Sequence, residues 1–112
     1  MPFKFSRCLC LQLPERDQAV DFYHKVMGLE VVKRDKESAE LRAGQNRLFL
    51  DEGHLMGPIM EFLVPHVEAA KVELMEAGCE VVLWEGEGKR CYMRDPFGFM
   101  FNLCQDPEAF SE

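Results

Sequence analysis

The sequence lacks the features of membrane, secreted or nucleic-acid-binding proteins. No apolar run approaches the length of a bilayer span, and the N-terminus MPFKFSRCL has neither a signal-peptide core nor a small-residue cleavage site. No segment gathers Lys and Arg into a stripe, and 13 basic against 20 acidic residues leave a net charge of −7. We therefore expect a cytoplasmic protein with no nucleic-acid or membrane partner.

The cysteines do not form a recognisable pairing pattern. There are 5, an odd number without a CxxC pair: Cys8, Cys10, Cys79, Cys91 and Cys104. This scatter favours reduced thiols over a disulfide framework. Cys8 and Cys10 are two residues apart on an expected strand, where Cα atoms lie about 7 Å apart, at or beyond the disulfide limit.

What is present is a patterned chain of 112 residues, 47% hydrophobic, which is enough to bury one core. Residues 5–13 alternate as a strand that Pro14 ends, and Ala19, Phe22, Tyr23 and Val26 follow at helical spacing before Gly28. This spacing predicts a helix whose apolar stripe is buried. Three further strands are predicted at 28–34, 38–43 and 46–51.

The same order then begins again. A strand at 58–64 ends at Pro65, a helical stripe runs over 67–77, and strands are predicted at 78–84, 89–94 and 97–104. GLEVV at 28–32 and GCEVV at 78–82 are matching pentapeptides fifty residues apart. The chain is therefore an internal repeat of a strand, a helix and three strands.

This pattern predicts an α+β fold in a single domain over 1–112. Two βαβββ modules, about 3–52 and 57–106, would form a curved eight-stranded mixed sheet with the helices outside. The other face of the sheet would be a concave cup, the usual place for a small ligand.

Two motifs and the segment between them carry a family resemblance. They are AVDFYHKVMGLEVV at 19–32, EFLVPHVEAAKVELMEAGCEV at 61–81 and YMRDPFGFMFNL, with its DPxG turn, at 92–103. The chain resembles the vicinal oxygen chelate superfamily, which includes glyoxalase I, bleomycin-resistance proteins and extradiol dioxygenases. The resemblance implies the fold predicted above and a homodimer, but the superfamily contains both enzymes and pure binding proteins.

The resemblance also implies a divalent metal held by His and Glu. The corresponding positions in this chain are Cys8, Phe49, Ile59 and Asn102. None is His or Glu, and the three histidines fall on the first helix, in a linker and at the start of the second helix. We therefore expect no bound metal and no cofactor.

Strand alternation predicts which side chains line the cup. They are Cys8, Cys10, Gln12, Arg47, Phe49, Asp51, Ile59, Glu61, Met100, Asn102 and Cys104. Phe99 and Phe101 then face the helices as core residues. Trp84 and Tyr92 add aromatic surface, with Trp84 either a lid at the rim or a semi-buried residue without function.

Two groups in the predicted cup have alternative interpretations. Glu61 is either a general base or ligand anchor, or the partner of Arg47 or Arg94 in a structural ion pair. The thiols of Cys8, Cys10 and Cys104 are either a patch for a soft metal or small hydrophobes.

These residues favour a metal-free binding protein that holds a small apolar or aromatic molecule in the cup. Two alternatives stay open. One is a lyase, isomerase or dioxygenase-like enzyme with an atypical site, in which Glu61 and Tyr92 serve as base and acid. The other is a non-catalytic structural or interaction module.

Overall fold

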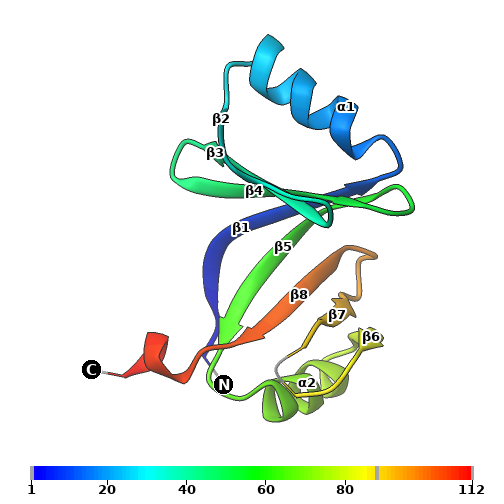
Figure 1. Cartoon of the computed structure of the whole chain (residues 1–112). Coiled ribbons are helices and arrows are strands. Elements are labelled where there is room, and N and C mark those ends of the chain that lie inside the picture. The colour runs from blue at the N-terminus through cyan, green and yellow to red at the C-terminus, as the bar shows by residue number, and fades with distance from the viewer. Residues whose placement is uncertain (1, 88, 112) are drawn as a thin grey trace. The chain divides into compact units, whose positions relative to one another are not determined.

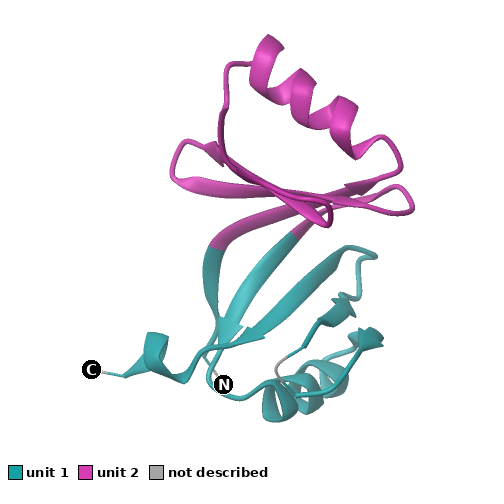
Figure 2. Cartoon of the chain, viewed as in Figure 1, with its two compact units in different colours: residues 1–6, 60–112 teal, residues 7–59 magenta. Residues whose placement is uncertain are grey.

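The chain divides into two compact units in a computed structural model that describes residues 2–87 and 89–111. Unit 1 comprises residues 1–6 and 60–112, and unit 2 comprises residues 7–59 (Figure 2). Among the described residues, no helix combines the length and apolar character needed to cross a bilayer.

The elements follow the predicted order closely. In chain order they are β1 (Lys4–Leu13), α1 (Arg16–Asp21), the π-helical η1 (Phe22–Val26), β2 (Glu30–Arg34), β3 (Ser38–Ala43), β4 (Asn46–Glu52), β5 (Met56–Val64), α2 (Val67–Glu76), β6 (Glu80–Trp84), β7 (Cys91–Arg94), β8 (Met100–Gln105) and the 3₁₀-helical η2 (Pro107–Phe110). The strand order is β2-β3-β4-β1-β5-β8-β7-β6. β1 pairs with β4 and β5 with β8 in parallel, whereas the hairpin partners are antiparallel. The predicted α+β class, two βαβββ modules in an eight-stranded mixed sheet, is confirmed.

In unit 2, α1 lies along one side of the strands (Figure 1). The buried cluster on this side consists of Val20, Ala39, Leu41, Leu48 and Leu50. The alternating leucines of β1 pack against this cluster. We call this side the helix face of unit 2 and the opposite side its open face.

In unit 1, α2 covers the corresponding helix face. Its cluster consists of Val64, Val67, Ala70, Cys91, Met93 and Leu103. Phe62 and Phe101 pack against the cluster with ring centroids 5.8 Å apart and planes at 81°. The prediction that Phe101 is a core residue is therefore confirmed.

The same prediction for Phe99 is wrong, because its side chain is 70% exposed. Asp95 Oδ1 accepts hydrogen bonds from the backbone N–H groups of Phe97 and Phe99, and β8 begins only at Met100. Phe99 therefore belongs to the turn, where strand alternation no longer applies.

The first helix also departs from the predicted stripe. Phe22 is 50% and Val26 71% exposed, whereas Tyr23 packs against the core of unit 2. The helix becomes π-helical at Phe22, and the N–H of Met27 donates to the carbonyl of Phe22, five residues back. The wider turn rotates the following side chains away from the α-helical stripe.

Both modules have a β-bulge at the same place in the repeat. The register shifts between Val31 and Lys33 in β2 and between Val81 and Leu83 in β6. Because a bulge adds one residue, it moves every later side chain to the other face of its strand. Arg34 and Trp84, which end these strands, consequently lie on the helix face of their units, opposite Ala39 and Cys91.

The two modules use these equivalent positions differently. Arg34 forms an ion pair with Asp21 of the first helix, at 3.2 Å. In unit 1, the Lys71 Nζ of α2 lies 3.1 Å from the ring centroid of Trp84. The Lys71 side chain is only 13% exposed and also pairs with Glu68 at 2.9 Å.

Replacing Lys71 with Met should lower the free energy of unfolding by about 1 kcal/mol, because a largely desolvated ammonium over an indole face is lost. Lys71→Arg should retain most of this stability. Urea unfolding followed by circular dichroism measures the difference. Lys25→Met, a matched change at an exposed lysine, should cost little, and an equal loss in both variants would contradict the assignment.

Candidate functional site

The open face of unit 1 carries one row of side chains across four strands. Strand register places Leu83 opposite Tyr92, Tyr92 opposite Asn102, and Asn102 beside Glu61. Asn102 is the centre of this row. Its Nδ2 donates to Glu61 Oε2 at 3.1 Å, and its Oδ1 accepts from the backbone N–H of Cys91 at 3.1 Å.

The Asn102 amide, held by two hydrogen bonds, fixes the orientation of the Glu61 carboxylate. Because the backbone N–H of Cys91 must meet an oxygen, the Asn102 amide can present only its nitrogen to Glu61. Among the described residues, Glu61 forms no ion pair. The expected structural partners are bonded to other residues, Arg94 to Glu80 and Arg47 to Glu40.

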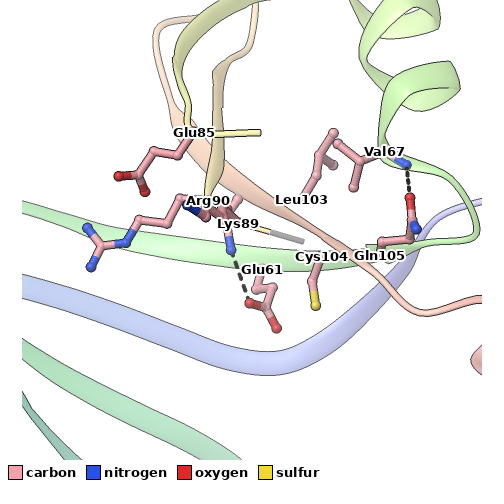
Figure 3. A pocket seen from close by; sticks show the side chains of 9 residues that line it. Glu61, Val67, Glu85, Lys89, Arg90, Leu103, Cys104 and Gln105 are labelled. Carbon is pink, nitrogen blue, oxygen red and sulfur yellow. Dashed lines mark hydrogen bonds between the residues drawn. The ribbon is translucent and has the colours of Figure 1, made fainter. Parts of the chain in front are cut away.

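A pocket of about 390 Å³ opens beside this row. Glu61 and Cys104 point to one side of their strands and Leu103 to the other, while Glu85 and Arg90 extend from the β6–β7 hairpin (Figure 3). The β7–β8 pairing ends at Tyr92 and Asn102, so β8 continues beyond its neighbour to Gln105. The pocket lies where the hairpin leaves the sheet.

The structure therefore brings five predicted residues of unit 1 onto one face: Glu61, Tyr92, Met100, Asn102 and Cys104. Trp84 is not among them. It packs against the α2 cluster because the bulge in β6 turns it to the helix face, so its expected place at a cup rim is wrong. Glu61 and Tyr92 are separated by the β8 residue Asn102, so their backbones lie about 10 Å apart, too far to share a proton directly.

The predicted residues of unit 2 also share one face. Cys8 pairs with Arg47, Cys10 with Phe49, and Gln12 with Asp51. The Cys10 thiol donates to Asp51 Oδ2 at 3.4 Å, and Gln12 Nε2 donates to the His54 carbonyl at 3.1 Å. Cys10 and Gln12 therefore tie β1 to β4 and to the turn that follows it.

Arg47 is the best-anchored cation on the open face of unit 2. Its Nε and one Nη donate to the two oxygens of Glu40, each at 3.0 Å, and its guanidinium lies 5.1 Å from the Phe49 ring centroid. The Glu40 side chain is 16% exposed. The hydrogen bond from Arg47 lowers the pKa of Glu40 below its ordinary value of 4.5 and outweighs the opposing effect of burial.

Two of the thiols are made less acidic by burial. Burial raises the pKa of the Cys79 thiol. It also raises the pKa of the Cys91 thiol, which lies fully inside the unit 1 core. Within residues 2–87 and 89–111, no three His, Cys, Asp or Glu side chains are grouped so that they could hold a metal. The alternative of a soft-metal patch formed by Cys8, Cys10 and Cys104 stays a prediction.

Comparison with known proteins agrees with this architecture. The profile of the glyoxalase-like domain matches residues 8–104, most of the chain. The chain belongs to the glyoxalase-like domain family. The resemblance to the vicinal oxygen chelate superfamily is thereby confirmed. No curated protein sequence matches this glyoxalase-like chain.

Several solved structures share the fold. A hypothetical protein from Bacillus halodurans C-125 is 14% identical with a TM-score of 0.70, and each chain is covered completely. Methylmalonyl-CoA epimerase from Mycobacterium tuberculosis is 14% identical with a TM-score of 0.60, covering 88% of this chain and 85% of that one. Homoprotocatechuate 2,3-dioxygenase from Brevibacterium fuscum is 24% identical with a TM-score of 0.67, and the match covers 93% of this chain but 37% of the dioxygenase.

The glyoxalase-like chain does not have the donors that the superfamily metal needs. Phe49 and Ile59 have no donor atom, and both amide atoms of Asn102 are already hydrogen-bonded. Cys8 alone offers a strong ligand at these four positions. A divalent transition metal needs three or four such donors, so the residues do not fit it.

The sequence analysis missed charged groups at the open face of each unit of the glyoxalase-like chain. Lys89 and Arg90 line the unit 1 pocket, and Glu40 is the partner that Arg47 selects. Glu40 lies opposite Phe49 in the strand register, so the alternation of 38–43 could have identified it. Lys89 and Arg90 fall within the predicted strand 89–94, but β7 begins only at Cys91, so strand alternation did not apply to them.

Replacing Asn102 with Asp tests the amide bridge. The variant places two carboxyl groups side by side, that of Glu61 and that of the new aspartate. Such a pair keeps a shared proton to a higher pH than two separate carboxyl groups do. The native state then binds more protons than the unfolded state, so the stability of the variant falls as the pH rises. At about pH 8 the variant should lose about 2 kcal/mol, and less at about pH 5.

Thermal unfolding across this pH range measures the effect. Asn46→Asp makes the same charge change at the β3–β4 turn, where arginines are nearby, and should not lose stability with rising pH. Parallel curves for the two variants would show that Asn102 does not bridge to Glu61.

The Arg47–Glu40 pair should make a pH-dependent contribution to stability. Because the folded pKa of Glu40 is lowered, the contribution is complete above about pH 4.5 and is lost as pH falls through the folded value. Arg47→Met should cost less than about 1 kcal/mol at neutral pH, since Arg47 is half exposed, and almost nothing once Glu40 is protonated. The control Arg42→Met removes the exposed pair with Glu30 and should lower the free energy of unfolding by less at either pH. Equal losses of stability in the two variants would argue against the contribution assigned to the Arg47–Glu40 pair.

Proposed function

We propose that this chain is a metal-independent binding protein for a small molecule with an apolar or aromatic body. The observation that carries the proposal is the Asn102 amide, which stands where the superfamily resemblance implies a metal ligand and instead holds the Glu61 carboxylate beside an open pocket. The site thus offers an oriented hydrogen-bond acceptor in place of a Lewis acid.

The row itself indicates what kind of molecule would fit. Leu83, 39% exposed, lies at one end and the Glu61 carboxylate at the other, so apolar contact and hydrogen-bond acceptance are separated along the row. A ligand with an aromatic or aliphatic body and a hydroxyl or amine group matches this order. The dioxygenase relative was solved with 3,4-dihydroxyphenylacetate, an aromatic molecule with two hydroxyls.

A catalytic role is less well supported. The atypical-site enzyme would need Glu61 and Tyr92 to act on one reacting group, and Asn102 stands between them. A structural module without a ligand would have no evident use for an oriented carboxylate at an open pocket. The homodimer and the cytoplasmic location stay predictions of the sequence.

Native mass spectrometry of protein purified from cells tests the proposal. We expect a bound organic molecule and, after incubation with zinc, nickel, manganese or iron(II), far less than one equivalent of metal. Calorimetry measures the binding of 3,4-dihydroxyphenylacetate in the absence of metal. Binding should be lost in Glu61→Gln but retained in Glu80→Gln, which removes a carboxylate outside the pocket. A stoichiometric divalent ion, or unchanged binding by Glu61→Gln, would refute this function; the same spectra give the subunit number.

A further inference from the structure

A second pocket, of about 490 Å³, lies within unit 2 at the turn between β3 and β4. Its lining includes Arg7, Arg42, Arg47, Glu40 and Gln45. Three arginines around one pocket are notable in a chain with a net charge of −7. None of the residues that line this pocket lines the Glu61 pocket, so a ligand bound here does not require the proposed function.

Arg7 has a backbone conformation that needs an explanation. Its φ is +67°, in the left-handed region that non-glycine residues seldom adopt. Regular alternation from Leu9 would place Arg7 on the helix face, but its guanidinium lines the open-face pocket and donates to Gln45 Oε1 at 3.1 Å. The unusual conformation thus directs a cation into the pocket, and such conformations are concentrated at functional sites.

The other two arginines are forced together by the sheet. Arg42 and Arg47 are direct partners in the antiparallel β3–β4 register, where like charges repel. Glu30 pairs with Arg42 at 3.2 Å, and Glu40 pairs with Arg47. Two carboxylates therefore compensate two arginines.

Arg7 has no such compensation. Among the described residues, no carboxylate forms an ion pair with Arg7, and its hydrogen-bond partner is the neutral amide of Gln45. The pocket therefore retains positive charge, and its guanidinium groups present several donors in fixed planes. Guanidinium is the side-chain group best matched to the oxygens of a carboxylate or a phosphate.

We propose that the Arg7 pocket binds the carboxylate or phosphate group of a small molecule, with Arg7 as the principal contact. The Glu40 bridge and the Phe49 ring hold Arg47 in place, so the second cation is positioned before the anion arrives. An incoming anion would offset both the uncompensated charge of Arg7 and the repulsion between the paired arginines.

Titration of ¹⁵N-labelled protein with inorganic phosphate and, separately, with acetate tests the proposal at constant pH and ionic strength. The amide signals of Gly44 and Gln45 should shift and saturate in the millimolar range. Arg7→Gln should weaken binding about tenfold, since one charge-assisted hydrogen-bonding group is lost. Arg94→Gln, which removes an arginine from the other unit, should bind as the unmodified protein does.

Arg7→Gly separates binding from backbone strain. Glycine adopts positive φ without steric cost, so this variant should melt at a higher temperature and yet lose the anion response. Tighter binding of phosphate would identify a phosphate-bearing ligand, and tighter binding of acetate a carboxylate. Absence of saturation with both anions, or undiminished binding by Arg7→Gly, would overturn the proposal.

Discussion

The parallel pairing of the first strand of each module with its last strand is the constraint on which the other features depend. It sets Cys10 beside Phe49 in one unit and Glu61 beside Asn102 in the other. Because side chains alternate along each strand, these two registers decide which residues are buried under the helices and which remain on the open faces. The Glu61–Asn102 hydrogen bond is a direct consequence of the second register.

The repeat preserves backbone geometry more closely than side-chain chemistry. Both modules contain the bulge after the first valine of the EVV segment, and both use it to bring the last residue of the strand under the helix. There an Arg34–Asp21 ion pair in one module corresponds to a Lys71–Trp84 cation–π contact in the other. The modules share this packing geometry because each must bury the helix face of its strands. Different pairs of side chains can fill the position at the end of the strand.

The open faces show the same divergence with functional consequences. Corresponding rows carry Glu40, Phe49 and Cys10 in unit 2 and Tyr92, Asn102 and Glu61 in unit 1. One unit therefore collects guanidinium groups held by a carboxylate, and the other a carboxylate held by an amide. A fold shared with a dioxygenase and an epimerase here presents a cluster of arginines on the open face of one unit and an oriented carboxylate on that of the other.

The sequence by itself determined the order of the strands, the duplication and the family, because these depend on local periodicity and on motifs such as DPFG. It also placed Glu61 and Asn102 on one face, whereas the strand register made them neighbours. Only the tertiary structure decided the position of Trp84, the exposure of Phe22 and the direction of Arg7. A bulge, a π-helical turn and a positive φ each shift side-chain direction by one position, and nothing in the local hydrophobic pattern records such a shift.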